Sequence, residues 1–184
     1  MSFPSACILD ACFVIDWARW RRRNLLKELF SMGFIPEITL REIITEKPLK
    51  MVRDLVTDGW LTAYPHSREL EEEAMRLILD LRKDPRIPRI DPPEATCVVL
   101  ARRFGLAVLT ENRGIIRAYR LFEDRFHPAV VLNSLRLLAH IFVRGLAGET
   151  SFSDLINEYE RDSSHSFSLL EVRTVAREFG IEKA

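Results

Sequence analysis

Short apolar stretches alternate along this chain with segments that carry apolar residues at helical spacing. Strands that alternate with helices form parallel sheets, because a parallel neighbour can be reached only through a long crossover connection. We therefore predict an α/β fold of three α/β/α layers, with a central parallel sheet and additional helices at the C-terminus. The candidate strands are 7–9, the start of 32–38, 60–64, 106–110 and 128–132.

Glycine, proline and capping residues bound the predicted helices. Ser67 can cap a helix over 67–83, whose first turns are acidic and whose last turn is basic. Pro48 is expected to end a helix that starts after Pro36, and the proline-rich stretch 84–93 is expected to be a stiff connection. The remaining predicted helices are 13–30, 37–46, 49–59, 94–105, 111–122, 133–145, 152–160 and 167–178.

The length of 184 residues suits one domain with a proper core. We predict a main domain over 1–147 and a helical extension over 148–184. The extension is expected to pack either on the main domain or on a partner. Lys plus Arg and Asp plus Glu both total 27, so nucleic-acid binding would have to rest on a local patch.

The three cysteines form no CxxC pair, which favours reduced thiols over a zinc site. The sequence has no signal-peptide pattern at its N-terminus and no apolar run long enough to cross a bilayer. We therefore expect a cytoplasmic protein without a membrane partner.

The apolar stretch Cys7, Ile8 and Leu9 is followed directly by Asp10. A buried carboxylate is costly unless it is paired, hydrogen-bonded or bound to a metal. In a parallel sheet the carboxyl end of a strand is where ligands bind. Asp10 is therefore either a helix N-cap or part of a functional site.

Further acids and polar residues occupy comparable places. Glu42 lies in the predicted helix after the second strand, Glu94 begins the helix before the strand 106–110, and Glu111 and Asn112 follow that strand. All of them could meet Asp10 at one edge of the sheet. Clustered carboxylates repel one another, a penalty that a divalent cation removes, and hard oxygen ligands favour Mg²⁺ or Mn²⁺. Glu46 is an alternative to Glu42, and Asp91 is a possible auxiliary to Glu94.

Three stretches together resemble the PIN domain, the family of metal-dependent ribonucleases that includes the VapC-type toxins. They are "ILDACFVID", "IPEITLREI" and "EATCVVLARRFGLAVLTEN", and the resemblance covers roughly residues 5–135. The stretch "LLKELFSMGFIPEITLREI" is similar to a branch of archaeal and bacterial proteins described as nucleic-acid-binding.

The resemblance implies that Asp10, Glu42 and Glu94 hold the metal and that Thr110 orients a carboxylate or a water. Asn112 takes the position of the family's fourth acid, and Cys12 replaces the polar residue that usually positions the first aspartate. These two departures favour low activity or dependence on RNA phosphates. Glu111 is a possible substitute for the fourth acid.

The same resemblance implies RNA as substrate, an antitoxin protein as possible partner and a homodimer. Arg113 and Arg117 are candidate phosphate contacts, as are Arg21 and Arg22 in the run "RWRRR", where Trp17 or Trp20 could stack on a base. A solvated basic helix face is the alternative for that run. The rival function is an RNA- or protein-binding module without catalysis. A flavodoxin-like fold is disfavoured because the chain lacks a glycine-rich phosphate loop.

Overall fold

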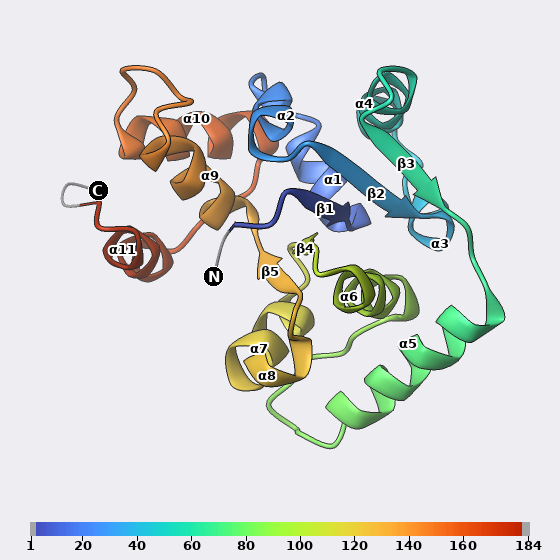
Figure 1. The fold of residues 1–184 in the computed structure, drawn as a ribbon. Helices are drawn as coiled ribbons and strands as arrows, with labels where there is room; N and C mark the ends of the chain where they lie inside the picture. The colour runs from blue at the N-terminus through green and yellow to red at the C-terminus, as the bar shows by residue number, and fades with distance from the viewer. Residues whose placement is uncertain (1–2, 182–184) are drawn as a thin grey trace.

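The computed structural model describes residues 3–181, and its core is a five-stranded, entirely parallel sheet with the order β3-β2-β1-β4-β5 (Figure 1). Helices cover both faces, which confirms the predicted α/β/α architecture. The strands are β1 (Ala6–Leu9), β2 (Met32–Pro36), β3 (Leu61–Tyr64), β4 (Ala107–Leu109) and β5 (Val130–Leu132).

The helices follow the strands in an alternating order. They are α1 (Ala11–Trp17), the short 3₁₀ helix η1 (Arg23–Leu25), α2 (Leu26–Leu29), α3 (Glu37–Leu40), α4 (Glu46–Thr57), α5 (Arg68–Leu81), α6 (Pro92–Phe104), α7 (Arg113–Leu121), α8 (Glu123–Phe126), α9 (Ser134–Val143), α10 (Phe152–Ser163) and α11 (Leu169–Glu178). None of the helices within residues 3–181 is both long and apolar enough to cross a membrane.

Alternation along the central strand β1 divides the core into two apolar clusters. Cys7 and Leu9 point into a cluster with residues of α1, α4, α9, α10 and α11, whereas Ile8 points into one with residues of α5, α6 and α7. Successive side chains of a strand face opposite sides of the sheet, so both faces must be apolar here.

The register of the sheet determines which residues meet at its carboxyl edge. Leu9 of β1 is paired with Leu109 of β4, and the N–H of Asp10 donates to the carbonyl of Leu109 at 3.0 Å. The residues that follow these two strands, Asp10 and Thr110, are therefore neighbours although they are far apart in sequence.

Four predictions of element bounds differ from the structure. The predicted connection 84–93 ends earlier, because Pro92 and Pro93 begin α6, where proline is tolerated. Pro48 does not end a helix but lies in the first turn of α4, where proline is tolerated because its missing N–H would have no partner. The predicted helix 37–46 is only the short α3, so Glu42 lies in a turn. The segment 13–30 breaks into α1, η1 and α2 around the basic run.

The C-terminal extension packs on the rest of the chain. Phe152, Leu155 and Tyr159 of α10 are fully buried in the same cluster as Trp17 and Trp20. Val175 and Ala176 of α11 belong to that cluster too. The apolar core is thus continuous between the main domain and the extension.

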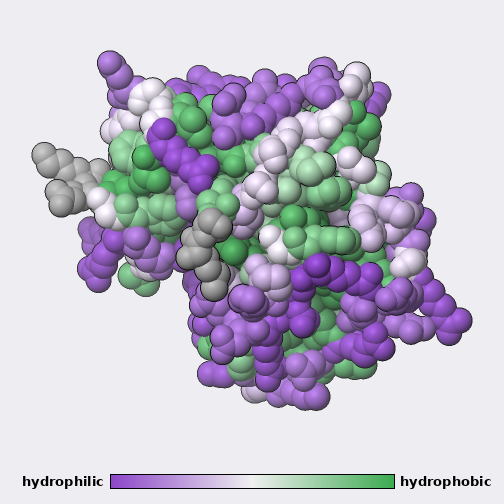
Figure 2. All heavy atoms as spheres, viewed as in Figure 1, coloured by the Kyte–Doolittle hydropathy of each residue, from purple (hydrophilic) through white to green (hydrophobic). Residues whose placement is uncertain are grey.

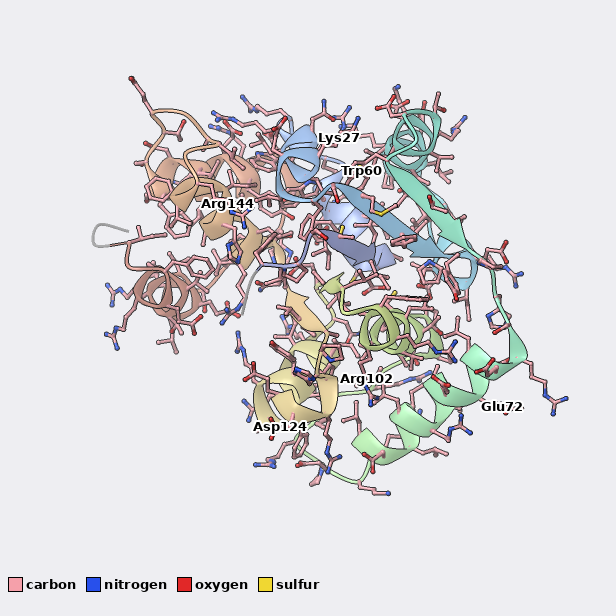
Figure 3. All side chains as sticks on the ribbon, viewed as in Figure 1. Lys27, Trp60, Glu72, Arg102, Asp124 and Arg144 are labelled. Atoms are coloured by element: carbon pink, nitrogen blue, oxygen red, sulfur yellow. The ribbon has the colours of Figure 1, made fainter. Side chains whose placement is uncertain are left out.

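Two glycines allow close approaches that a side chain would prevent. A Cβ on Gly33 would lie 2.6 Å from the Trp60 ring, which packs over β2 (Figure 3). A Cβ on Gly114, in α7, would lie 2.8 Å from the carbonyl oxygen of Pro88 and 2.9 Å from that of Arg89. The proline-rich connection between α5 and α6 therefore rests directly on the first turn of α7.

We expect Gly114→Ala to destabilise the protein by about 1–3 kcal/mol, because backbone atoms of the connection would have to move. In an open helix the same change would stabilise by about 1 kcal/mol. Urea unfolding measures the difference, with the exposed neighbour Arg113→Ala as control. A variant as stable as the wild type would contradict the close approach.

Candidate functional site

Asp10 is at the centre of the carboxyl edge and is only 1% exposed. It is the N-cap of α1, where its Oδ1 accepts from the Ala11 N–H at 2.8 Å. Its Oδ2 accepts from the Thr110 hydroxyl at 2.6 Å and from the Cys12 thiol at 2.8 Å. Asp10 therefore has a capping role, and its second oxygen is held by donors from two further positions.

Thr110 and Cys12 also fix the turn that follows β4. The Thr110 hydroxyl accepts from the Asn112 N–H at 3.0 Å, and the Cys12 sulfur accepts from the Glu111 N–H at 3.2 Å. Cys12, which departs from the expected residue type, thus still contacts the first aspartate. Nothing in the sequence beyond its position two residues after Asp10 indicated this contact.

The pKa of Asp10 is raised by burial, and the hydrogen bonds from Cys12, Thr110 and Ala11 oppose that rise. Each donor favours the ionised carboxylate. The three donors therefore offset part of the cost of burying the negative charge, and a bound cation would offset more of it.

Glu94 lies in the first turn of α6 and accepts hydrogen bonds on both oxygens. The Asp91 N–H donates to Oε2 at 2.9 Å in a capping box, and the Asn112 side-chain amide donates to Oε1 at 3.0 Å. Burial, followed by the charges of Asp10, Asp91 and Glu42, raises the pKa of Glu94 to about 6. The charges of both other carboxylates predicted for the site therefore act on Glu94.

Glu42 approaches the same edge from the turn after α3. Its side chain is exposed, and its pKa is raised by partial burial and by the charges of Asp10 and Asp91. Glu46, the alternative, begins α4 and is exposed. The charge of Asp10 raises the pKa of Glu42, and the charge of Glu42 raises that of Glu94, which supports Glu42 as the third acid.

The two polar residues after Thr110 point in different directions. Asn112 turns toward Glu94, and its Oδ1 caps α7 by accepting from the Ile115 N–H at 3.0 Å. Glu111 turns away: its carboxylate accepts from the Ser134 N–H at 2.6 Å and lies 3.7 Å from the His165 ring. Glu111 therefore does not stand in for a fourth acid beside Asp10.

The acids share one edge but form no closed cage. No group of three or more His, Cys, Asp or Glu side chains within residues 3–181 is close enough to hold a metal ion. Like charges repel at short range, and both Asp10 and Glu94 are already occupied by hydrogen-bond donors. The donor set of hard oxygens fits Mg²⁺ or Mn²⁺, and these side chains would have to move to enclose a cation.

The candidate arginines fall into two groups. Arg113 and Arg117 are exposed on α7, directly after the site. Arg21 instead forms a two-pronged ion pair with Asp162 of α10, and Arg22 pairs with Glu158 and donates to the Ala147 carbonyl.

The two tryptophans beside the basic run are not available for base stacking. Trp17 and Trp20 are both 0% exposed, so that prediction is wrong. The reason is α10: it covers both rings, and its Glu158 accepts from the Trp20 indole N–H at 2.8 Å. From the sequence alone, a basic run with two tryptophans could not be distinguished from a nucleic-acid surface.

Comparison with family models finds none that matches this chain, and no curated protein matches it. The resemblance to the PIN domain therefore stays a prediction that rests on the sequence motifs.

We expect Thr110→Val to destabilise the protein by about 1–3 kcal/mol, because the buried Asp10 oxygen loses its shortest donor. Thr110→Ser keeps the hydroxyl and should retain most of that stability. Chemical unfolding of both variants is the measurement, and equal losses would mean that the methyl group, not the hydrogen bond, is what matters.

The raised pKa of Glu94 gives the stability a definite pH dependence. Between its ordinary value of 4.5 and about 6, folded Glu94 keeps a proton that the unfolded chain releases. Its stabilising contribution is therefore complete below 4.5 and is lost as the pH rises through 6. In metal-free buffer, the unfolding free energy of wild type minus that of Glu94→Gln should fall between these limits. A difference in unfolding free energy that does not change with pH would exclude the raised pKa of Glu94.

Proposed function

We propose that this protein is a metal-dependent ribonuclease of the PIN type that hydrolyses RNA phosphodiester bonds. The observation that carries the proposal is the arrangement of acids at the carboxyl edge of a parallel sheet. Hydrogen bonds through Thr110 and Asn112 link Asp10 to Glu94. Burial and the charge of Asp10 raise the pKa of both Glu42 and Glu94. Carboxylates clustered at such an edge repel one another and lower the stability of the fold. Such clusters are therefore typical of functional sites.

The residues suit distinct tasks in such a reaction. Asp10, oriented by three donors, would provide a fixed carboxylate oxygen. Glu94, with a pKa of about 6, can accept a proton from an attacking water near neutral pH. Glu42 adds a third, more mobile oxygen from the rim. A bound Mg²⁺ or Mn²⁺ would neutralise phosphate charge and lower the pKa of a bound water.

The positions around the carboxylates provide binding and orientation. Thr110 and Cys12 fix Asp10, and the Asn112 amide fixes Glu94. Arg113 and Arg117 extend from the site on the exposed side of α7 and suit the phosphates of an RNA backbone. The proposal also includes an antitoxin protein as partner. It further includes assembly of this chain into a homodimer and a location in the cytoplasm.

The alternative is a PIN-type RNA- or protein-binding module that does not cut. The observation in its favour concerns the fourth acid. An asparagine, Asn112, stands at that position and donates a hydrogen bond to Glu94, and the side chain of Glu111 points away from the site. Cleavage and metal binding distinguish the two functions.

We expect the purified protein to cut unstructured RNA with Mn²⁺ and to lose activity in EDTA. Asp10→Asn and Glu94→Gln should lower the rate by at least about 100-fold, because each removes charge or proton transfer from the reaction. Gel analysis of a labelled RNA measures the rate.

The matched control is a pair of glutamates four residues apart. Glu42→Gln should reduce cleavage, whereas Glu46→Gln, at the exposed start of α4, should not. The ribonuclease proposal fails if the wild type cuts no RNA and calorimetry detects no binding of Mn²⁺ or Mg²⁺.

A further inference from the structure

Three arginines share one exposed face of α7. Arg113, Arg117 and Arg120 are spaced by four and three residues, which places them in one row along the helix. None of the three forms an ion pair within the described part of the chain, whereas Arg21, Arg22, Arg86, Arg89, Arg103, Arg125 and Arg136 all do. The row is therefore a strip of positive charge without a salt-bridge partner in that part of the chain.

The acids near this row are engaged with other partners. Asp84, on the side of Arg117, is bound by Arg86 at 2.6 Å. Glu171, on the side of Arg113 and Arg120, accepts from the N–H and the hydroxyl of Ser168 in the capping box of α11. Glu171 keeps its own charge because Ser168 is neutral. The three arginines, near this carboxylate and that of Glu123, still leave the row with a net positive charge.

The row starts at the candidate site. Asn112, the N-cap of α7, is hydrogen-bonded to Glu94, and Arg113 is the first residue of the helix. At a rise of about 1.5 Å per residue, Arg120 lies about 10 Å farther along the axis. Hydrophilic side chains cover this part of the surface, around the positions of α7 and α8 (Figure 2).

A pocket of about 230 Å³ opens beside the far end of the row. Ile116, Tyr119 and Val131 give it apolar and aromatic walls, and Arg120, Asn133 and Arg136 add donors. Glu123, which accepts from the Tyr119 hydroxyl at 3.3 Å, adds one carboxylate to the lining. The Asn133 oxygen caps α9, and this cap does not use its amide hydrogens. An aromatic wall next to a cation is the combination on which unpaired bases stack.

We propose that the α7 row is the binding track for single-stranded RNA, with the Tyr119 pocket taking a base on one side of the cleaved bond. The inference rests on the proposed ribonuclease function and assigns Arg120, Ile116 and Tyr119 to substrate binding. A duplex does not suit this surface, because its bases are stacked inside and cannot enter the pocket.

The test is fluorescence anisotropy in EDTA, where the RNA is bound but not cut. The probes are an unstructured RNA of about eight nucleotides and a hairpin containing the same sequence. We expect the wild type to prefer the single strand. Arg120→Gln should reduce the slope of log affinity against log salt by about 0.7, the value for one phosphate contact in a single strand.

The matched control is Arg53→Gln. Arg53 is exposed in α4, which lies on the opposite side of the molecule from α7 (Figure 1). Its substitution should therefore leave the RNA affinity and the salt slope unchanged. Ile116→Trp should fill the pocket and weaken binding without changing the slope, because the phosphate contacts remain. Thermal melts of all variants identify any that fail to fold.

The outcomes separate this inference from the function on which it rests. Equal slopes for Arg120→Gln and Arg53→Gln, or equal affinity for strand and hairpin, overturn the track even if the wild type cuts RNA. An Arg120-dependent slope without cleavage at any Mn²⁺ concentration supports the track and overturns the ribonuclease. A wild type that binds neither probe overturns the track.

Discussion

The hydrogen bonds on the Asp10 carboxylate are the interaction on which the rest of the site depends. They join the end of β1, the start of α1 and the end of β4 through one buried group. The alignment of Leu9 with Leu109 makes this possible, since it sets the two strand ends side by side. If the Thr110 or the Cys12 side chain were lost, the buried carboxylate would be less well compensated and the turn at residues 110–112 would lose an anchor.

The arrangement gives several side chains two functions at once. Asp10 caps α1, Glu94 closes the capping box of α6, and Asn112 caps α7. The three helices therefore begin at the same edge of the sheet, with their positive dipole ends directed toward the acids. The positive potential of these helix ends partly offsets the repulsion among the carboxylates. It would also attract a negatively charged ligand. Such positions serve stability and chemistry together.

The sequence predicts the sheet well because its strands are short apolar runs with clear ends. It also predicts that the end of the strand 106–110 lies near Asp10, since both strands belong to one parallel sheet, and the hydrogen bond from Thr110 to Asp10 agrees with this. It does not predict the orientation of Glu111, because that depends on the Ser134 N–H and on His165 far along the chain. The roles of Arg21, Arg22 and Trp20 are missed for the same reason: α10 supplies their partners.

The contacts between α10 and the basic run have a consequence for any shortened form of this protein. A fragment ending near residue 147 would uncover the Trp17 and Trp20 rings and would deprive Arg21 and Arg22 of Asp162 and Glu158. Its surface would then combine bare aromatic rings with unneutralised guanidinium groups. Such a fragment would be prone to adhere indiscriminately to polyanions and to itself, a behaviour that the intact chain suppresses with its own last helices.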